Sequence, residues 1–353
     1  MRKTLAGLLA AAMVFTMVGC GSTNDSSVNE ENTNQGESNT QTEAVSYKLG
    51  MGTSISTASS QEGNAQVDAT VAAVVLDQDG KIVSCKVDVA QNKMDVTDGQ
   101  VPEDAADATY LTKKELKDDY GMKGASGIGK EWYEQAEAFE QFVVGKTADE
   151  VAAIPVEEAE GHTVTTDADL AAGCTMSVSA LMEATTKACN DAYARTYEGE
   201  GTLNLAITSS TNYATVSAAD GEDGIAAMYS CFSAVVVDSE GKILCDVYDE
   251  AQPKVTFNEL GEITSDPEAA ILTKRELHDD YGMIGASSIG KEWYDQAAAM
   301  EEYVVGKTAD EVTAIETVEN EGHNVAVDET LAASCTISIG DIIVCIAKAA
   351  TLQ

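Results

Sequence analysis

The chain has 353 residues, 44% of them hydrophobic, which is enough for two domains that each bury a core of their own. Its 60 acidic and 21 basic residues give a net charge of -39, which repels the phosphates of nucleic acids and of anionic lipid headgroups. We therefore exclude nucleic-acid binding. The acidic residues lack the regular spacing of a calcium loop, and we expect them to form a solvated surface.

The N-terminus has the layout of a signal peptide. Arg2 and Lys3 precede an apolar run over residues 5–18, which Gly19 and Cys20 follow. The run is shorter than the roughly 20 residues that a membrane-spanning helix needs. Residues 17–20, Met-Val-Gly-Cys, resemble a bacterial lipobox. The resemblance implies that residues 1–20 are a lipoprotein signal peptide and that lipid on Cys20 anchors the chain to the cell membrane, outside the cytoplasm. An uncleaved anchor and ordinary secretion are the alternatives.

The segment 21–45 is composed almost entirely of Ser, Asn, Thr, Gln, Glu and Gly. Such a composition buries too little apolar surface to offset the entropy that is lost on ordering. We therefore predict a disordered tether between the anchor and the rest of the chain.

The remainder of the chain is a duplication. Residues 111–151 match residues 272–312 at 32 of 41 positions, with an offset of 161 residues. A repeat of this length indicates a duplicated domain and not a solenoid. We predict a first repeat domain over residues 46–196 (copy one) and a second over residues 201–353 (copy two). The polar stretch 197–201 is the expected linker.

Local patterns predict the same elements in both copies. Tight turns at Gly80 and Gly241 indicate a hairpin of two strands in each copy. Four capping boxes predict the starts of short helices: Thr112 with Glu115, Thr147 with Glu150, Thr273 with Glu276, and Thr308 with Glu311. Apolar stripes at helical spacing predict one longer helix per copy: Trp132, Ala136, Phe139 and Val143, then Trp293, Ala297, Met300 and Val304. With final helices over 179–193 and 338–351, each copy is predicted to be α+β, a small antiparallel sheet packed with helices on one face.

Seven cysteines follow Cys20, an odd number, so at least one is free or pairs between chains. Cys174 and Cys335 are equivalent, whereas Cys85 and Cys245 miss equivalence by one residue, which reverses the face of a strand. A disulfide framework shared by the copies is therefore not expected. A zinc site is not expected either, because no two cysteines are closely spaced.

Residues 169–175, Asp-Leu-Ala-Ala-Gly-Cys-Thr, precede the last helix of copy one. Small residues let the backbone approach a ligand closely, and amide groups at a helix start favour an anion such as phosphate. The structural alternative is an ordinary helix cap with a buried cysteine.

The order of a hairpin, intervening helices and D-x-x-x-G-x-T before a final helix resembles the bacterial FMN-binding domain of extracytoplasmic flavoproteins. In that family the last residue of the motif receives FMN through a phosphoester. The resemblance implies that Thr175 is the attachment residue, Asp169 the recognition acid and Gly173 the motif glycine. In copy two, Thr336 matches the attachment residue, but Thr330 replaces the acid. We therefore predict covalent FMN in copy one, and a structural or noncovalent role for copy two.

The segments before the two long helices are the most alike pieces of the copies. Lys130 and Lys291 are candidates for a phosphate contact, and Trp132 could form a wall against which a flat ring stacks. A tight connection with buried aromatic rings is the alternative. His162 and His323 are equivalent, but no second ligand lies at metal spacing, so we expect loop histidines without a special role and no metal site.

No nucleophile elbow, phosphate-binding glycine loop or paired-carboxylate signature is present, so we assign no catalytic residue. Two functions remain. The first is a membrane-anchored extracytoplasmic electron carrier, in which FMN supplies the chemistry and other redox proteins are the partners. The alternative is a cofactor-free surface lipoprotein that binds a small molecule, a peptide or a protein.

Overall fold

The computed structural model describes residues 45–159, 161–211 and 214–351. The predicted signal peptide, which includes Cys20, lies outside the described residues. The predicted tether also lies outside them, except for its last residue. Both copies belong to one compact unit, Ala44–Gln353. Within the described ranges, no helix has both the length and the apolar character needed to cross a membrane.

The sheet of copy one has four antiparallel strands in the order β3-β2-β1-β6. Its strands are β1 (Ser46–Ser56), β2 (Asn64–Leu76), β3 (Ile82–Asp95) and β6 (Arg195–Glu198). The predicted turn joins β2 to β3, and Gly80 within it has a φ of 73°, which glycine adopts without strain. Strand β6 corrects the expected linker over 197–201, because Tyr197 pairs with Tyr47 of β1 and is buried.

Copy two repeats this arrangement with a break in the sheet. Its strands are β7 (Thr202–Ser210), β8 (Gly224–Ala227), β9 (Tyr229–Val237), β10 (Ile243–Ala251) and β11 (Lys254–Phe257). They form one sheet in the order β10-β9-β7 and a separate pair, β11-β8. Each copy also has a small hairpin: β4 (Val156–Ala159) with β5 (His162–Thr165), and β12 (Thr317–Asn320) with β13 (His323–Ala326). All of these pairings are antiparallel, which confirms the predicted α+β class.

The helices follow the sequence patterns closely. Copy one contains α1 (Lys113–Leu116), η3 (Lys117–Tyr120), α2 (Trp132–Val143), α3 (Ala148–Ala152), α4 (Ala168–Ala171) and α5 (Ser179–Cys189). Copy two contains α6 (Lys274–Leu277), η4 (His278–Tyr281), η5 (Met283–Gly285), α7 (Trp293–Val304), α8 (Ala309–Thr313), α9 (Glu329–Ala332) and α10 (Gly340–Thr351). Two short 3₁₀ helices, η1 (Thr97–Gly99) and η2 (Ala105–Asp107), follow β3. All four predicted capping boxes are present, and both apolar stripes are buried.

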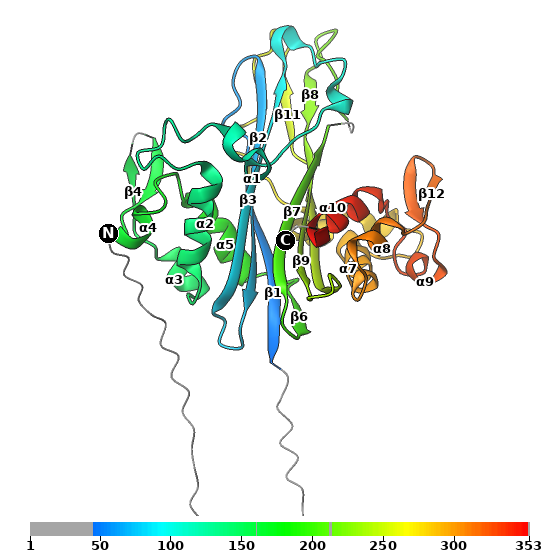
Figure 1. The fold of residues 1–353 in the computed structure, drawn as a ribbon. Coiled ribbons are helices and arrows are strands. Elements are labelled where there is room, and N and C mark those ends of the chain that lie inside the picture. The colour runs from blue at the N-terminus through cyan, green and yellow to red at the C-terminus, as the bar shows by residue number, and fades with distance from the viewer. Residues whose placement is uncertain (1–44, 160, 212–213, 352–353) are drawn as a thin grey trace, which may run out of the picture. The chain divides into compact units, whose positions relative to one another are not determined.

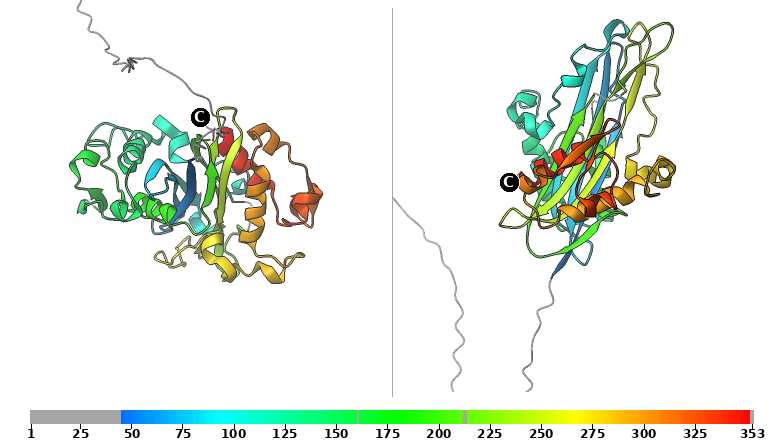
Figure 2. Two further views of the ribbon diagram at one scale, coloured as in Figure 1. Left: turned by 90° about the horizontal axis from the view of Figure 1, so that it is seen from below. Right: turned by 90° about the vertical axis from the view of Figure 1, so that its right-hand side faces the viewer.

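The two main sheets pack against each other, and the helices of each copy cover the outer face of its own sheet (Figures 1 and 2). Along β2, Ala72 and Val74 face the helices, whereas Ala73 and Val75 face copy two. Phe232 of β9 is fully buried in the same core between the sheets. Both faces of each sheet are therefore buried. The sequence predicted helices on one face of each sheet and did not predict what covers the other face.

Close backbone packing holds α5 on β1. A Cβ atom added to Gly52 would lie 2.4 Å from both the Ala184 carbonyl oxygen and the Ala188 nitrogen. That separation is impossible for real atoms, so the contact requires glycine. A buried glutamate ties each long helix to its sheet: Glu140 accepts a hydrogen bond from the Val87 nitrogen, and Glu301 accepts one from the Tyr248 nitrogen, both at 2.7 Å.

The seven cysteines are all unpaired, and six of them are buried. Cys85 faces the helices of copy one, whereas Cys245 lies in the core between the sheets. The shift of one residue therefore reverses the face, as predicted, and the cysteines pack as small apolar side chains.

Candidate functional site

The loop that carries Thr175 rests on a buried base. Asp167 caps α4 by accepting hydrogen bonds from the nitrogens of Asp169 at 3.0 Å and Leu170 at 3.2 Å. Leu170 and Cys174 are buried in the helical core of copy one, whereas Thr175 is exposed. The loop thus holds an exposed threonine in a fixed position.

A buried glutamine orients this threonine. Gln135 of α2 is fully buried, and its Oε1 accepts hydrogen bonds from the Thr175 nitrogen at 2.8 Å and the Thr175 hydroxyl at 3.3 Å. Its Nε2 donates to the Ser126 hydroxyl and to the Lys130 carbonyl oxygen, both at 3.1 Å. The glutamine therefore joins the threonine loop to the glycine-rich segment before α2.

Copy two repeats the same contacts. Gln296 accepts from the Thr336 nitrogen at 2.8 Å and hydroxyl at 3.0 Å, and donates to the Ser287 hydroxyl at 3.2 Å. Neither glutamine was predicted from the sequence. The available signal was an amide side chain on the buried face of each long helix, where a polar group needs a partner.

A lysine lies beside each threonine loop. A Cβ atom added to Gly173 would lie 3.9 Å from the Lys130 ammonium nitrogen and 2.7 Å from the Ala138 Cβ. The glycine is therefore required by packing against α2, and the ammonium group is next to the loop. Burial raises the pKa of Cys174 to about 11, although the charge of Lys130 lowers it. The buried thiol is therefore protonated at neutral pH.

A cavity of about 810 Å³ opens at the threonine loop of copy two. Its wall includes Lys274, Tyr281, Trp293, Gln296, Cys335 and Thr336. Thr336 is half-buried, so its hydroxyl borders the cavity without being sealed from it. The wall combines aromatic rings, a hydroxyl, a lysine that is paired with Glu250, and the further carboxyl groups of Glu321 and Asp341; such a mixture of apolar and polar groups is usual in sites for organic ligands.

Lys274 is the cation of this cavity. Its ammonium nitrogen contacts the Glu250 carboxylate and lies 4.9 Å from the centre of the Trp293 ring and 5.1 Å from that of Tyr281. Burial lowers the pKa of Lys274, but the Glu250 charge outweighs this effect, and the pKa is raised overall. Copy one places Lys113 over the equivalent rings, but Val89 stands at the position of Glu250.

The remaining predicted residues lie at the margin of this arrangement. Asp169 is exposed on α4, and Thr330 is exposed at the equivalent place on α9. His162 and His323 begin strands β5 and β13, which corrects their expected place in loops, and His323 borders the cavity of copy two. In the described part of the chain, no group of three or more His, Cys, Asp or Glu could hold a metal ion.

Comparison with known proteins gives one partial similarity. No protein-family model and no solved structure matches the chain. A chlorophenol reductase from Desulfitobacterium hafniense is 35% identical over 102 residues, which cover 26% of this chain and 31% of that protein. The chain thus spans about a third of the length of this curated relative.

Proposed function

We propose that the protein is an extracytoplasmic, lipid-anchored electron carrier that binds FMN. The observation that carries this proposal is the cavity of copy two, whose wall brings the Thr336 hydroxyl together with Lys274 and the Trp293 ring. Its volume of about 810 Å³ lies within the range of roughly 300–1,000 Å³ that is usual for cofactor sites. A bound flavin would supply one-electron and two-electron transfer.

The side chains of this cavity fit the parts of FMN. Tyr281, which is half-buried in the wall, offers aromatic surface to a flat ring, and the buried Trp293 supports the wall from behind. Burial raises the pKa of the Cys335 thiol to about 11, and the nearby charge of Lys291 partly opposes this rise, so a cation lies near the Thr336 loop, where a phosphate would be held. Gln296 fixes the Thr336 hydroxyl, which is the group that the family resemblance assigns to the phosphoester.

The charge of the protein favours covalent attachment. A net charge of -39 repels the dianionic phosphate of free FMN and weakens its binding at equilibrium. A flavin transferase would take the FMN moiety from FAD, break the pyrophosphate bond, release AMP and join the phosphate to the threonine hydroxyl. The resulting phosphoester would keep one negative charge, and the covalent bond would hold the flavin whatever its affinity for the site. Thr175 is exposed and Thr336 is half-buried, and each hydroxyl donates a hydrogen bond to a buried glutamine that fixes its position. Attachment at Thr336 goes beyond the prediction from the sequence, which assigned covalent FMN to copy one alone.

A redox role also agrees with the similarity described above. The curated relative is named a reductase, which favours redox chemistry in the segment that the two chains share. Lipid on Cys20 would keep the flavin close to redox proteins of the same membrane.

The proposal is tested by expressing the full chain with and without a flavin transferase and measuring its intact mass. We expect a gain of one FMN for each loaded copy. Thr175→Ala removes the FMN of copy one, and Thr336→Ala that of copy two, because each substitution deletes the hydroxyl that forms the ester. The control is Thr317→Ala, at an exposed threonine of β12, which leaves the mass gain unchanged.

Two further measurements complete the test. Titration of the untreated chain with FMN, followed by flavin fluorescence, measures noncovalent binding, which Tyr281→Leu weakens if the half-buried ring stacks on the flavin. An unmodified chain that also leaves flavin fluorescence unchanged contradicts the proposal. Separately, Cys20→Ala moves the chain from the membrane fraction to the soluble fraction, and retention of the variant in the membrane contradicts the lipid anchor.

A further inference from the structure

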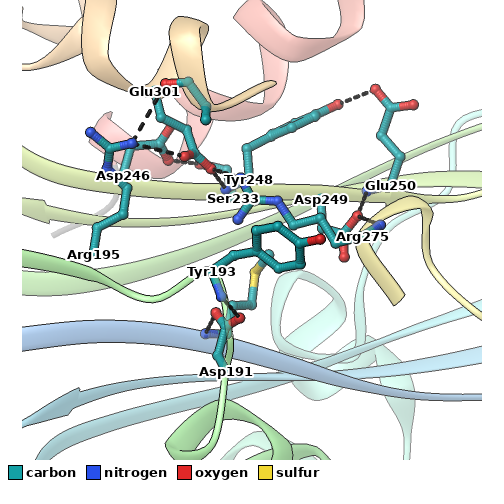
Figure 3. Close-up of polar contacts among 12 residues, drawn as sticks. Asp191, Tyr193, Arg195, Ser233, Asp246, Tyr248, Asp249, Glu250, Arg275 and Glu301 are labelled. Atoms are coloured by element: carbon teal, nitrogen blue, oxygen red, sulfur yellow. Dashed lines mark hydrogen bonds and ion pairs between the residues drawn. The ribbon is translucent and has the colours of Figure 1, made fainter. Parts of the chain in front are cut away.

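A second cavity, of about 420 Å³, lies between the two copies. Copy one contributes β1 and the loop after α5, and copy two contributes β10 and α6. The residues of its wall that matter here are Met51, Asp191, Tyr193, Val247, Asp249 and Arg275, most of which are drawn in Figure 3. It shares no wall residue with the cavity at Thr336.

Arg275 is the unusual member of this wall. Its side chain is 5% exposed, its Nη2 donates to Glu301 at 2.6 Å, and its guanidinium lies 4.8 Å from the centre of the Tyr193 ring. Among the described residues, neither Nε nor Nη1 of Arg275 has a hydrogen-bond partner. These two nitrogens carry three N–H groups, and buried donors without an acceptor are unfavourable.

The equivalent position in copy one shows that the ion pair does not require arginine. Lys114 stands there and contacts Glu140, the counterpart of Glu301. A lysine therefore satisfies the buried glutamate of this fold. The two remaining nitrogens of Arg275 are buried beside the cavity wall and have no acceptor among the described residues.

Charges of both signs line the cavity and define what can enter. Lys187 and Arg275 are its cations, and Asp191, Asp249 and Glu276 are its carboxyl groups. A simple anion would meet three carboxyl groups, and a simple cation would leave the Arg275 donors without acceptors. A neutral molecule that carries both charges meets both requirements, because it adds no net charge to the wall.

We propose that this cavity binds a small zwitterion, an α-amino acid with an apolar side chain. Its carboxylate accepts hydrogen bonds from Arg275, and its ammonium group donates to Asp191 or Asp249. Met51 and Val247 supply apolar surface for the side chain. The inference does not rest on flavin binding, since the two cavities are separate.

The test is isothermal titration calorimetry of the purified full chain with L-leucine, L-methionine and L-phenylalanine. We expect at least one of them to bind. Isocaproate lacks the ammonium group of leucine, and isopentylamine lacks its carboxylate. Each binds more weakly than leucine by a factor on the order of ten or more. No heat with any of the three amino acids at millimolar concentration overturns the proposal, and isocaproate binding as tightly as leucine overturns the zwitterion.

The matched variants are Arg275→Lys and Arg195→Lys. Both arginines pair with Glu301, but only Arg275 belongs to the wall of the cavity. Lys114 in copy one indicates that the first variant folds, and a thermal unfolding curve verifies this. Arg275→Lys weakens amino-acid binding by about tenfold or more, because the free guanidinium donors are lost, whereas Arg195→Lys leaves binding unchanged. Equal affinity of the Arg275→Lys variant and the parent chain overturns the proposal.

Discussion

Replacement of Asp249 by asparagine changes how the stability of the protein depends on pH. Asp249 lies on β10 and is 7% exposed. Its Oδ1 accepts hydrogen bonds from the nitrogens of Glu250 at 2.8 Å and Arg275 at 3.2 Å. Burial raises the pKa of this carboxyl to about 7, although the Arg275 charge and the hydrogen bonds lower it. Asparagine keeps an oxygen acceptor for both nitrogens and removes the titration.

The sign and size of the effect follow from proton linkage. Between the ordinary pKa of 3.8 and the folded value of about 7, the folded chain holds a proton that the unfolded chain has released. The contribution of Asp249 to the free energy of unfolding is therefore fully present below pH 4 and is lost as the pH rises through 7. Each pH unit costs about 1.4 kcal/mol, so the loss between pH 5 and pH 7 is about 2–3 kcal/mol.

Urea unfolding at pH 5, 6, 7 and 8 measures this difference. The fluorescence of the two buried tryptophans, Trp132 and Trp293, reports the unfolding. We expect Asp249→Asn to gain about 2–3 kcal/mol relative to the parent chain between pH 5 and pH 8. The exposed Asp79→Asn serves as the control and shows no such trend. Parallel pH profiles of the parent chain and Asp249→Asn would refute the reasoning.

Three further substitutions test the packing. Gly52→Ala lowers the free energy of unfolding by several kcal/mol, because its Cβ would overlap the α5 backbone. The control is Gly124→Ala, whose Cβ would meet no atom within 4 Å and which changes this free energy by less than about 1 kcal/mol. Equal denaturation midpoints of the two variants would contradict the close approach of α5 to β1. Phe232→Ala costs about 3–5 kcal/mol in urea unfolding and leaves a single transition, because both copies share the core that it fills; separate transitions of the two copies would argue against that core. Thr308→Ala removes a capping box and lowers the thermal stability by about 1 kcal/mol, and an unchanged melting temperature would show that the cap is unimportant.

Sequence patterns predicted the elements that local interactions determine. The capping box of Thr112 with Glu115 and the stripe that begins at Trp132 depend on residues three or four positions apart, so one helix is enough to specify them. The turn at Gly80 depends on the backbone freedom of one residue. These features were confirmed because no distant partner decides them.

The packing of one sheet on the other was not predicted, because it depends on residues far apart in the chain. The run from Val71 to Leu76 contains no polar residue, and a strand with one face in water would alternate instead. That run indicated burial on both faces but not what covers them. Likewise, the exchange of Lys114 for Arg275 looks conservative in sequence, and only the fold shows that it adds unpaired donors to a cavity.

The shared core between the sheets has a consequence for the history of the chain. A single unit of this kind would expose the same apolar sheet face, and self-association about a twofold axis is the simplest way to cover it. Joining two units in one polypeptide replaces that association with an intramolecular contact that no longer depends on protein concentration. Fusion also ends the symmetry between the two units. In a homodimer one substitution changes both subunits, whereas in this chain each half changes separately, and Cys85 and Asp246 occupy equivalent strand positions with different chemistry. Duplication thus let one strand position keep a small apolar side chain in one half and acquire a buried carboxyl group in the other.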